Sequence, residues 1–234
     1  MFASMRSKDR ILVIKRIPYK DNLYIIDSLG EESGRRQFML PASSTAAGKR
    51  HRALSHPMQF LQVEYVGKSK RWPRLIHLHS LWTPVHIRSD MRKTAMAYFM
   101  LENIQQLIRE GEASLLFDWV YESFRRLEEE AYHPDFHLRF MVEMLDVLGI
   151  RPRQDEFGMF FDVKNGVLNR LMDVLNWKTY QLSLFYRFLE GDVLADRHER
   201  REALELAADY ITFFYDHYRL PKSLNVYKEV FDEE

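Results

Sequence analysis

The stretch GKRHRALSHPMQFLQVEYVGKSKRWPR, residues 48–74, decides the fold class of this chain. From Met58 to Val66 it alternates in the manner of a β-strand, and its β-branched and aromatic side chains favour a half-buried, extended segment. Cationic side chains flank this strand on both sides: Lys49, Arg50 and Arg52 before it, and Lys68, Lys70, Arg71 and Arg74 after it. A polyanion crossing a small sheet would meet both groups, so the stretch indicates nucleic-acid binding. Two solvated turns rich in Lys and Arg are the simpler alternative.

Strand-like runs recur on either side of this stretch. They are separated by turn residues and cover residues 11–17, 23–29, 37–40, 58–66 and 75–82. Five short strands in succession suit a small Greek-key barrel such as an OB-fold, which commonly binds oligonucleotides across its second and third strands and the adjoining loops. An SH3-like barrel would show a similar pattern.

The periodicity becomes helical after Thr83 and Pro84, which predicts a domain boundary near residues 83–89. Apolar residues at helical spacing predict helices at residues 90–110, 114–130, 134–148, 176–189 and 199–218. Residues 160–168 predict a small β-hairpin, because the pair Asn165-Gly166 suits a tight turn. The predicted fold class is therefore α+β, with an OB-fold nucleic-acid-binding barrel of five strands in residues 1–84. A helical bundle with the hairpin near 160–168 follows in residues 85–234.

The composition restricts the function classes. The chain has no Cys, which excludes disulfides and thiolate zinc sites and is compatible with a reducing cytoplasm. The formal net charge is zero, yet residues 1–80 contain 15 Lys and Arg against 6 Asp and Glu, and the remainder is correspondingly acidic. Such asymmetry would direct a DNA or RNA ligand towards the first part. The sequence shows neither a secretion signal nor a run of about 18 apolar residues, so we expect a soluble cytoplasmic protein without a membrane partner.

Signatures of catalysis fail one at a time. The Gly-Lys pair at residues 48–49 lacks the upstream Gly and the following Ser or Thr of a phosphate-binding loop, and the GxGxxG, GxSxG and HExxH motifs are absent. His77 with His79, and His133 with His137, have spacings that a metal can use, but without a third ligand ordinary histidines are the simpler interpretation. We therefore expect a binding protein that is not an enzyme, with no cofactor, no metal and no small-molecule substrate.

Aromatic residues between the cations indicate how a nucleic acid would be held. Trp72 lies between Arg71 and Arg74, and Tyr65 ends the preceding strand. An exposed aromatic ring can stack on a base while neighbouring cations hold phosphate. The alternative is that both rings pack inside the barrel. Arg35 and Arg36, at the start of the third strand, add a further cationic site.

Four segments in the same order resemble the bacterial DNA repair and recombination mediator family RecO. ILVIKRIPYKDNLYIIDSLGEESGRRQFML at residues 11–40 is similar to the opening strands of the family, and HPMQFLQVEYVGK at 56–68 to the strand after its basic loop. LRFMVEMLDVLGIRP at 138–152, followed by MFFDVKNGVL at 159–168, is similar to the Leu-Gly helix end and the Phe-Asp hairpin. HYRLPKSLNVYKEVF at 217–231 is similar to the final segment.

Two departures qualify the resemblance. Some relatives carry four Cys around the hairpin, whereas this chain has none, so the resemblance is to the branch that lacks zinc. The loop after the third strand usually begins with Arg and Lys in the family, but here it begins PASSTAA and becomes basic only at Lys49. DNA contact by this loop is therefore less secure than contact by Arg35 and Arg36, which match the basic strand of the family.

The resemblance implies a non-catalytic, nucleoid-associated protein that binds single- and double-stranded DNA and promotes annealing. It further implies contacts with RecR and single-stranded-DNA-binding protein and, indirectly, with the RecA filament. Together with the cations and the aromatic residue found from the sequence pattern, the predicted DNA-binding residues are Arg35, Arg36, Lys49, Arg50, Arg52, Lys68, Lys70, Arg71, Trp72 and Arg74, and the surface for protein partners is unknown. Two alternatives stay open: a protein-interaction scaffold without DNA binding, and an RNA-binding OB-fold adaptor.

Overall fold

The computed structural model describes residues 6–67, 71–108, 115–154, 160–161, 177–192, 194 and 196–224. The chain divides into two compact units, residues 1–131 and residues 132–234, which are described separately below. Within the described residues, no helix is long and apolar enough to cross a membrane.

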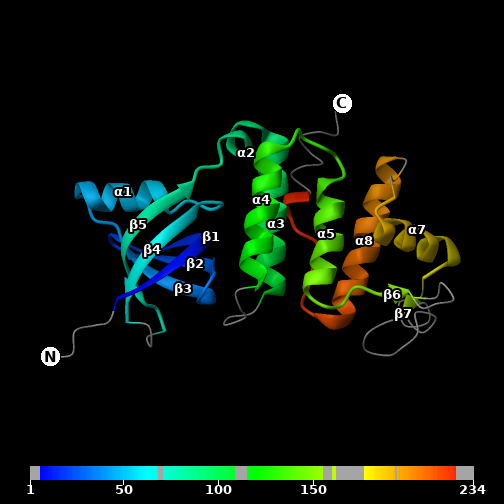
Figure 1. Ribbon diagram of the computed structural model, residues 1–234, viewed down its shortest axis with the longest axis horizontal. Coiled ribbons are helices and arrows are strands. Elements are labelled where there is room, and N and C mark those ends of the chain that lie inside the picture. The colour runs from blue at the N-terminus through cyan, green and yellow to red at the C-terminus, as the bar shows by residue number, and fades with distance from the viewer. Residues whose placement is uncertain are drawn as a thin grey trace. The chain divides into compact units, whose positions relative to one another are not determined.

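The first unit begins with five strands that close into a barrel in the order β1-β2-β3-β5-β4 (Figure 1). The strands are β1 (Arg6–Lys20), β2 (Leu23–Gly30), β3 (Gly34–Pro41), β4 (Phe60–Val66) and β5 (Arg74–Trp82). Neighbours pair antiparallel except β3 and β5, which run parallel and meet at Met39 and Arg74. This closure is the five-stranded Greek-key arrangement of an OB-fold, and it confirms the predicted barrel.

The strand β1 belongs to both halves of the barrel because it is long and bent. Its first part pairs with β4 and its second part with β2, and register shifts occur between Val13 and Lys15 and between Pro18 and Lys20. Bulges of this kind increase the local twist and let one strand turn a barrel corner. The last residues of β1, next to the turn at Asp21 and Asn22, are thereby directed away from the core and are exposed.

The barrel interior is filled by alternating side chains from all five strands. Its buried residues are Ile11, Val13, Ile26, Phe38, Leu40, Leu61, Val63, Tyr65, Leu75 and Leu78. Tyr65 is only 2 % exposed and meets Phe38 edge to face with ring centroids 5.0 Å apart. Tyr65 is therefore a core residue, so of the two interpretations of this ring, packing inside the barrel is correct.

A helix that the sequence did not indicate, α1 (Ala46–Leu54), lies between β3 and β4 and contacts β3 and β5 (Figure 1). Thr45 caps it by accepting a hydrogen bond from the backbone N–H of Gly48. Gly48 is buried in this helix. The position requires glycine, because an added Cβ would lie 2.1 Å from the backbone oxygen of Ser43. At the end of α1, Leu54 packs against the barrel core, whereas Lys49 and Arg50 are exposed.

Three helices complete the first unit: α2 (Val85–Ser89), α3 (Met91–Leu107) and α4 (Leu115–Glu129). The ring of Phe60, fully buried in β4, stacks on Trp82 and meets Phe117, Tyr121 and Phe124 of α4 at centroid distances of 5.0 to 6.1 Å. The change from strands to helices thus occurs where the periodicity predicts it, after Trp82, while the compact unit continues to residue 131. Independent folding of residues 1–84 stays a prediction.

Two buried charges connect these helices. The carboxylate of Glu128 accepts hydrogen bonds of 2.8 to 2.9 Å from the backbone N–H groups of Val85, His86 and Ile87, which start α2. Lys93, which is 6 % exposed, donates to the backbone carbonyls of Glu128 and Glu130 at the end of α4. Each charge therefore satisfies backbone groups that a helix end leaves unpaired.

The second unit contains α5 (Phe136–Val147), α7 (Thr179–Glu190) and α8 (Arg197–Phe214). Gly149 and Gly191 follow α5 and α7 with φ angles of +68° and +76°, the left-handed conformation in which glycine commonly ends a helix. Tyr210 of α8 is fully buried, packs on Phe185 of α7 and donates its hydroxyl to the carbonyl of Ile150. Apolar contacts and the ion pair of 2.8 Å between Arg187 and Glu199 thus join α7 to α8, and the hydroxyl bond joins α8 to the segment that follows α5.

A two-stranded sheet also belongs to the second unit. It joins β6 (Arg153–Gln154) to β7 (Phe160–Phe161) in antiparallel pairing. The predicted hairpin begins at Phe160, but its turn at residues 165–166 lies outside the described residues, and the pairing that the structure describes for Phe160 and Phe161 is with the preceding segment.

Candidate nucleic-acid interface

Two aromatic rings meet on the barrel surface beside the turn between β1 and β2 and the loop between β4 and β5. Tyr19, at the end of β1, and Trp72, in the loop before β5, lie edge to face with ring centroids 5.3 Å apart and an interplanar angle of 74°. Tyr19 is 45 % exposed, whereas Trp72 is half-buried. These two rings, with the neighbours described next, are called the Tyr19–Trp72 cluster.

Two hydrogen bonds fasten the cluster to strand β3. The indole N–H of Trp72 donates to the side-chain oxygen of Gln37 at 3.0 Å. The backbone N–H of Met39 donates to the carbonyl of Pro73 at 2.8 Å, next to the point where β3 and β5 close the barrel. The loop that carries Trp72 is therefore held at both its ring and its backbone.

Two cations flank the rings. The Nζ atom of Lys20 lies 5.5 Å from the ring centroid of Tyr19, and the guanidinium carbon of Arg71 lies 5.2 Å from that of Trp72. Arg74, which begins β5, is exposed as well. Aromatic rings bordered by positive charge are the arrangement with which proteins hold single-stranded nucleic acids, since the rings stack on bases and the cations contact phosphates.

Helix α1 carries a second group of cations. Lys49 and Arg50 are exposed on it, which places the basic group of the predicted loop on a helix rather than on an irregular segment. Arg52 differs, because its guanidinium donates to the carbonyl of Ala42 at 2.8 Å and is half-buried. Lys49 and Arg50 are thus available to a phosphate, whereas the guanidinium of Arg52 is bound to the segment that precedes α1.

Arg35 and Arg36 have different surroundings, although the sequence treats them alike. Arg35 forms an ion pair with the buried Asp27 at 3.1 Å and donates to the carbonyl of Ile108 at 2.7 Å. Arg35 therefore satisfies a backbone carbonyl that the end of α3 leaves unpaired, and this is a structural role. Arg36 is half-buried, with its guanidinium carbon 6.0 Å from the ring centroid of Phe38.

The predicted site residues thus separate into groups. The structure brings together Trp72 and Arg71 and adds to them Tyr19, Lys20 and Gln37, which the sequence pattern did not single out. Lys68 and Lys70, predicted in the same loop, lie outside the described residues. The signal for the missed pair was present in the sequence, since Tyr19-Lys20 is an aromatic residue beside a cation at the first tight turn, where OB-folds commonly contact oligonucleotides.

The histidine pairs do not form a described metal site. Over the residues that the structure describes, no group of three or more His, Asp or Glu side chains lies close enough to hold a metal ion. His77 and His79 are exposed on β5. His137 is buried, and burial, together with the nearby charge of Arg200, lowers its pKa to about 4, so it is neutral at physiological pH.

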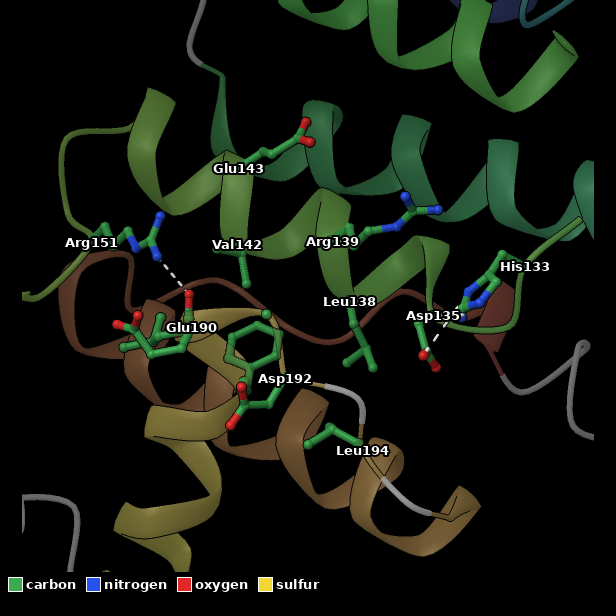
Figure 2. A pocket seen from close by; sticks show the side chains of 13 residues that line it. His133, Asp135, Leu138, Arg139, Val142, Glu143, Arg151, Glu190, Asp192 and Leu194 are labelled. Carbon is green, nitrogen blue, oxygen red and sulfur yellow. Dashed lines mark hydrogen bonds and ion pairs between the residues drawn. The ribbon is translucent and has the colours of Figure 1, made fainter. Parts of the chain in front are cut away.

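The second unit has a cavity of about 430 Å³ between α5, the end of α7 and the segment that follows it (Figure 2). Leu138, Val142 and Leu194 give it an apolar lining, and side chains of both charges surround them. Among the cations, Arg151 is held by Asp146 at 2.8 Å and by the carbonyl of Leu189. The cavity is thus an apolar hollow whose charged rim has more carboxylates than guanidinium groups.

Comparison with known proteins agrees with these observations. Residues 88–156 match the family described as "Recombination protein O C terminal". The protein named DNA repair protein RecO of Porphyromonas gingivalis strain ATCC 33277 is 29 % identical over 95 % of this chain and 98 % of its own length. Those of Flavobacterium psychrophilum and Bacteroides fragilis strain ATCC 25285 are each 25 % identical, over 97 % and 94 % of this chain and 100 % and 97 % of their own lengths.

An OB-fold barrel followed by helices, similar over nearly its whole length to repair proteins, defines a DNA repair and recombination protein. The agreement covers both units, because the family match lies across the end of the first unit and the beginning of the second. The chain is thus similar to the RecO repair proteins over nearly its whole length, and residues 88–156 match the C-terminal family model of these proteins.

Proposed function

We propose that this RecO-like protein is a non-catalytic DNA-binding mediator of repair that holds DNA on its barrel. The observation that carries the proposal is the Tyr19–Trp72 cluster, which places aromatic rings and cations beside the two loops that OB-folds use for oligonucleotides. The exposed Lys49 and Arg50 of α1, and Arg74 of β5, add positive charge on the same barrel. Cations supply affinity through displaced counterions, and rings supply contact with bases.

The resemblance to the RecO family supports the finer part of the proposal. In this proposal the protein binds single- and double-stranded DNA, promotes annealing, and acts with RecR and single-stranded-DNA-binding protein to help load RecA. It works in the cytoplasm, in association with the nucleoid. The cavity of the second unit, which Leu138, Val142 and Leu194 line in part, is the place that we propose for a protein partner.

The test is a titration of the full chain with a labelled oligothymidylate at several salt concentrations. The double variant Lys49→Gln with Arg50→Gln should bind more weakly, and its log–log salt slope should be shallower by about 0.7 for each phosphate that the variant no longer neutralises. The matched control is Lys178→Gln with Arg201→Gln, which removes two cations from the second unit and should leave the slope unchanged. Absence of binding at low salt would contradict the proposal and favour a scaffold without DNA binding.

An RNA competitor of equal length separates the remaining alternative. A DNA mediator should bind the RNA no more tightly than the DNA, because phosphate contact and base stacking do not distinguish the two sugars. Clear preference for the RNA would instead indicate an RNA-binding adaptor on the same fold.

A further inference from the structure

The two rings of the Tyr19–Trp72 cluster differ in how much surface they offer to a ligand. Trp72 is half-buried, its indole N–H is bound to Gln37, and its ring is covered in part by the edge contact with Tyr19 and by Arg71. Tyr19 has 45 % of its surface exposed, at the end of a strand rather than in a long loop. Trp72 is therefore fixed, whereas Tyr19 is presented to the solvent.

We infer that Tyr19 is a stacking platform for an unpaired base and that Trp72, fixed by Gln37, holds it in position. This inference rests on the proposed DNA binding and adds the form of DNA that the site selects. A duplex keeps the faces of its bases covered by their neighbours, so a stacking platform can act on a duplex only after a base has been unstacked, which costs free energy. The cations, in contrast, contact phosphates of either form.

Lys20 does not block the platform. Its ammonium lies 5.5 Å from the Tyr19 ring centroid, and an exposed contact of this kind contributes only about 2- to 5-fold to an equilibrium. Stacking of one base contributes about 5- to 150-fold, which is the larger effect. A base can therefore take the place of Lys20 on the ring, and the displaced ammonium is then close to the phosphate of the same nucleotide.

The ring and the cations would contact different parts of the DNA, so removing each should have a different effect on single strands and on duplexes. Removal of the Tyr19 ring should reduce affinity for single strands and leave affinity for a duplex unchanged. Removal of cations such as Lys49 and Arg50 should reduce both. Gln37 is a positioning residue in this scheme, because it holds the Trp72 indole rather than the DNA.

The experiment compares Tyr19→Ala, Tyr19→Phe and the control Tyr180→Ala, an exposed tyrosine of the second unit, by fluorescence anisotropy on the full chain. The probes are a labelled oligothymidylate and a blunt duplex of equal length. Tyr19→Ala should weaken binding of the single strand by about 5- to 150-fold and change duplex binding less than about 2-fold, while Tyr19→Phe and Tyr180→Ala should match the parent protein. Gln37→Ala should show a smaller loss on the single strand alone.

The outcomes distinguish the two proposals. Equal weakening of both DNA forms by Tyr19→Ala, or no weakening of either, would overturn the platform while the cation variants still test DNA binding. If the parent protein binds neither probe, the proposed DNA binding itself fails. Thermal unfolding of each variant, followed by circular dichroism, tests whether the barrel stays folded after substitution of Tyr19 or Gln37.

Discussion

Arg35 of barrel strand β3 donates a hydrogen bond of 2.7 Å to the backbone carbonyl of Ile108, the residue that ends helix α3. The same guanidinium pairs with Asp27, whose side chain is only 5 % exposed. A cation at the C-terminal end of a helix is favoured by the partial negative charge of the last carbonyls. Arg35 thus joins the barrel to the end of a helix that lies 73 residues further along the chain, and this is its role in the fold.

We expect Arg35→Ala to lower the free energy of unfolding by about 3 kcal/mol, because it leaves the buried Asp27 carboxylate without its partner. Arg36→Ala, one residue further along the same strand, should cost less than half as much. Urea denaturation of the full chain measures both values. Equal midpoints for the two variants would contradict the structural role of Arg35, and any loss of DNA binding in Arg35→Ala has to be compared with this loss of stability.

Glu128 provides a second stability test. Burial tends to raise the pKa of its carboxyl, but the N–H groups of Ile87, His86 and Val85 outweigh burial and the net shift is downward. Glu128→Leu would leave these N–H groups of α2 unpaired, and we expect a loss of about 1 to 3 kcal/mol. The control is Glu129→Leu, since Glu129 is exposed and pairs with Arg125 in the same helix. Comparable losses in the two variants would show that the cap contributes nothing.

The stability of the second unit should depend on pH through His137. Its folded pKa of about 4 lies below the ordinary value of 6.5, so the unfolded chain binds a proton more readily between these values. The stabilisation by neutral His137 is therefore complete above pH 6.5 and is lost as pH falls towards 4, by on the order of 3 kcal/mol. Denaturation at pH 7 and pH 5 should show a smaller difference for His137→Gln than for the parent chain. The exposed His198 supplies the control variant His198→Gln, which should keep the parent difference.

Gly48 tests the packing of α1 against the chain before it. Gly to Ala inside a helix ordinarily stabilises by about 1 kcal/mol, because Ala has the higher helix propensity. Here the added Cβ would lie 2.1 Å from the oxygen and 2.5 Å from the nitrogen of Ser43, both backbone atoms that cannot rotate aside. We therefore expect Gly48→Ala to destabilise by at least about 1 kcal/mol, more than Ala47→Gly in the same helix. A gain in thermal stability would show that α1 is not seated as described.

The barrel was predictable from sequence because its strands have clear two-residue periodicity and are separated by turn residues. The five predicted runs all lie within or at the observed strands, apart from Met58 and Gln59, which precede β4. Met58 has a left-handed φ of +69°, so the chain turns there before the strand begins. Helix α1 was missed because its sequence, AAGKRHRAL, has no apolar stripe, and its one buried position is a glycine.

The candidate site was less predictable, since its members come from three separate parts of the chain. Tyr19, Gln37 and Trp72 meet only because β1, β3 and the loop before β5 are neighbours in the closed barrel. Arg35 could not be assigned to α3 from sequence, because its carbonyl partners lie 70 and 73 residues away. Charge and local pattern find cations and rings, but they do not show which cations are already bound within the protein.

The hydrogen bond from Met39 to Pro73 lies at the parallel seam where the barrel closes, and the same short segment carries Trp72. In thermodynamic terms this makes barrel closure and ligand occupancy linked equilibria, because the proposed site exists only when the seam is shut. A ligand at 100 times its dissociation constant would stabilise the folded chain by about 2.7 kcal/mol. Hydrogen exchange at the Met39 amide would therefore report occupancy of a site to which Met39 itself contributes no side chain.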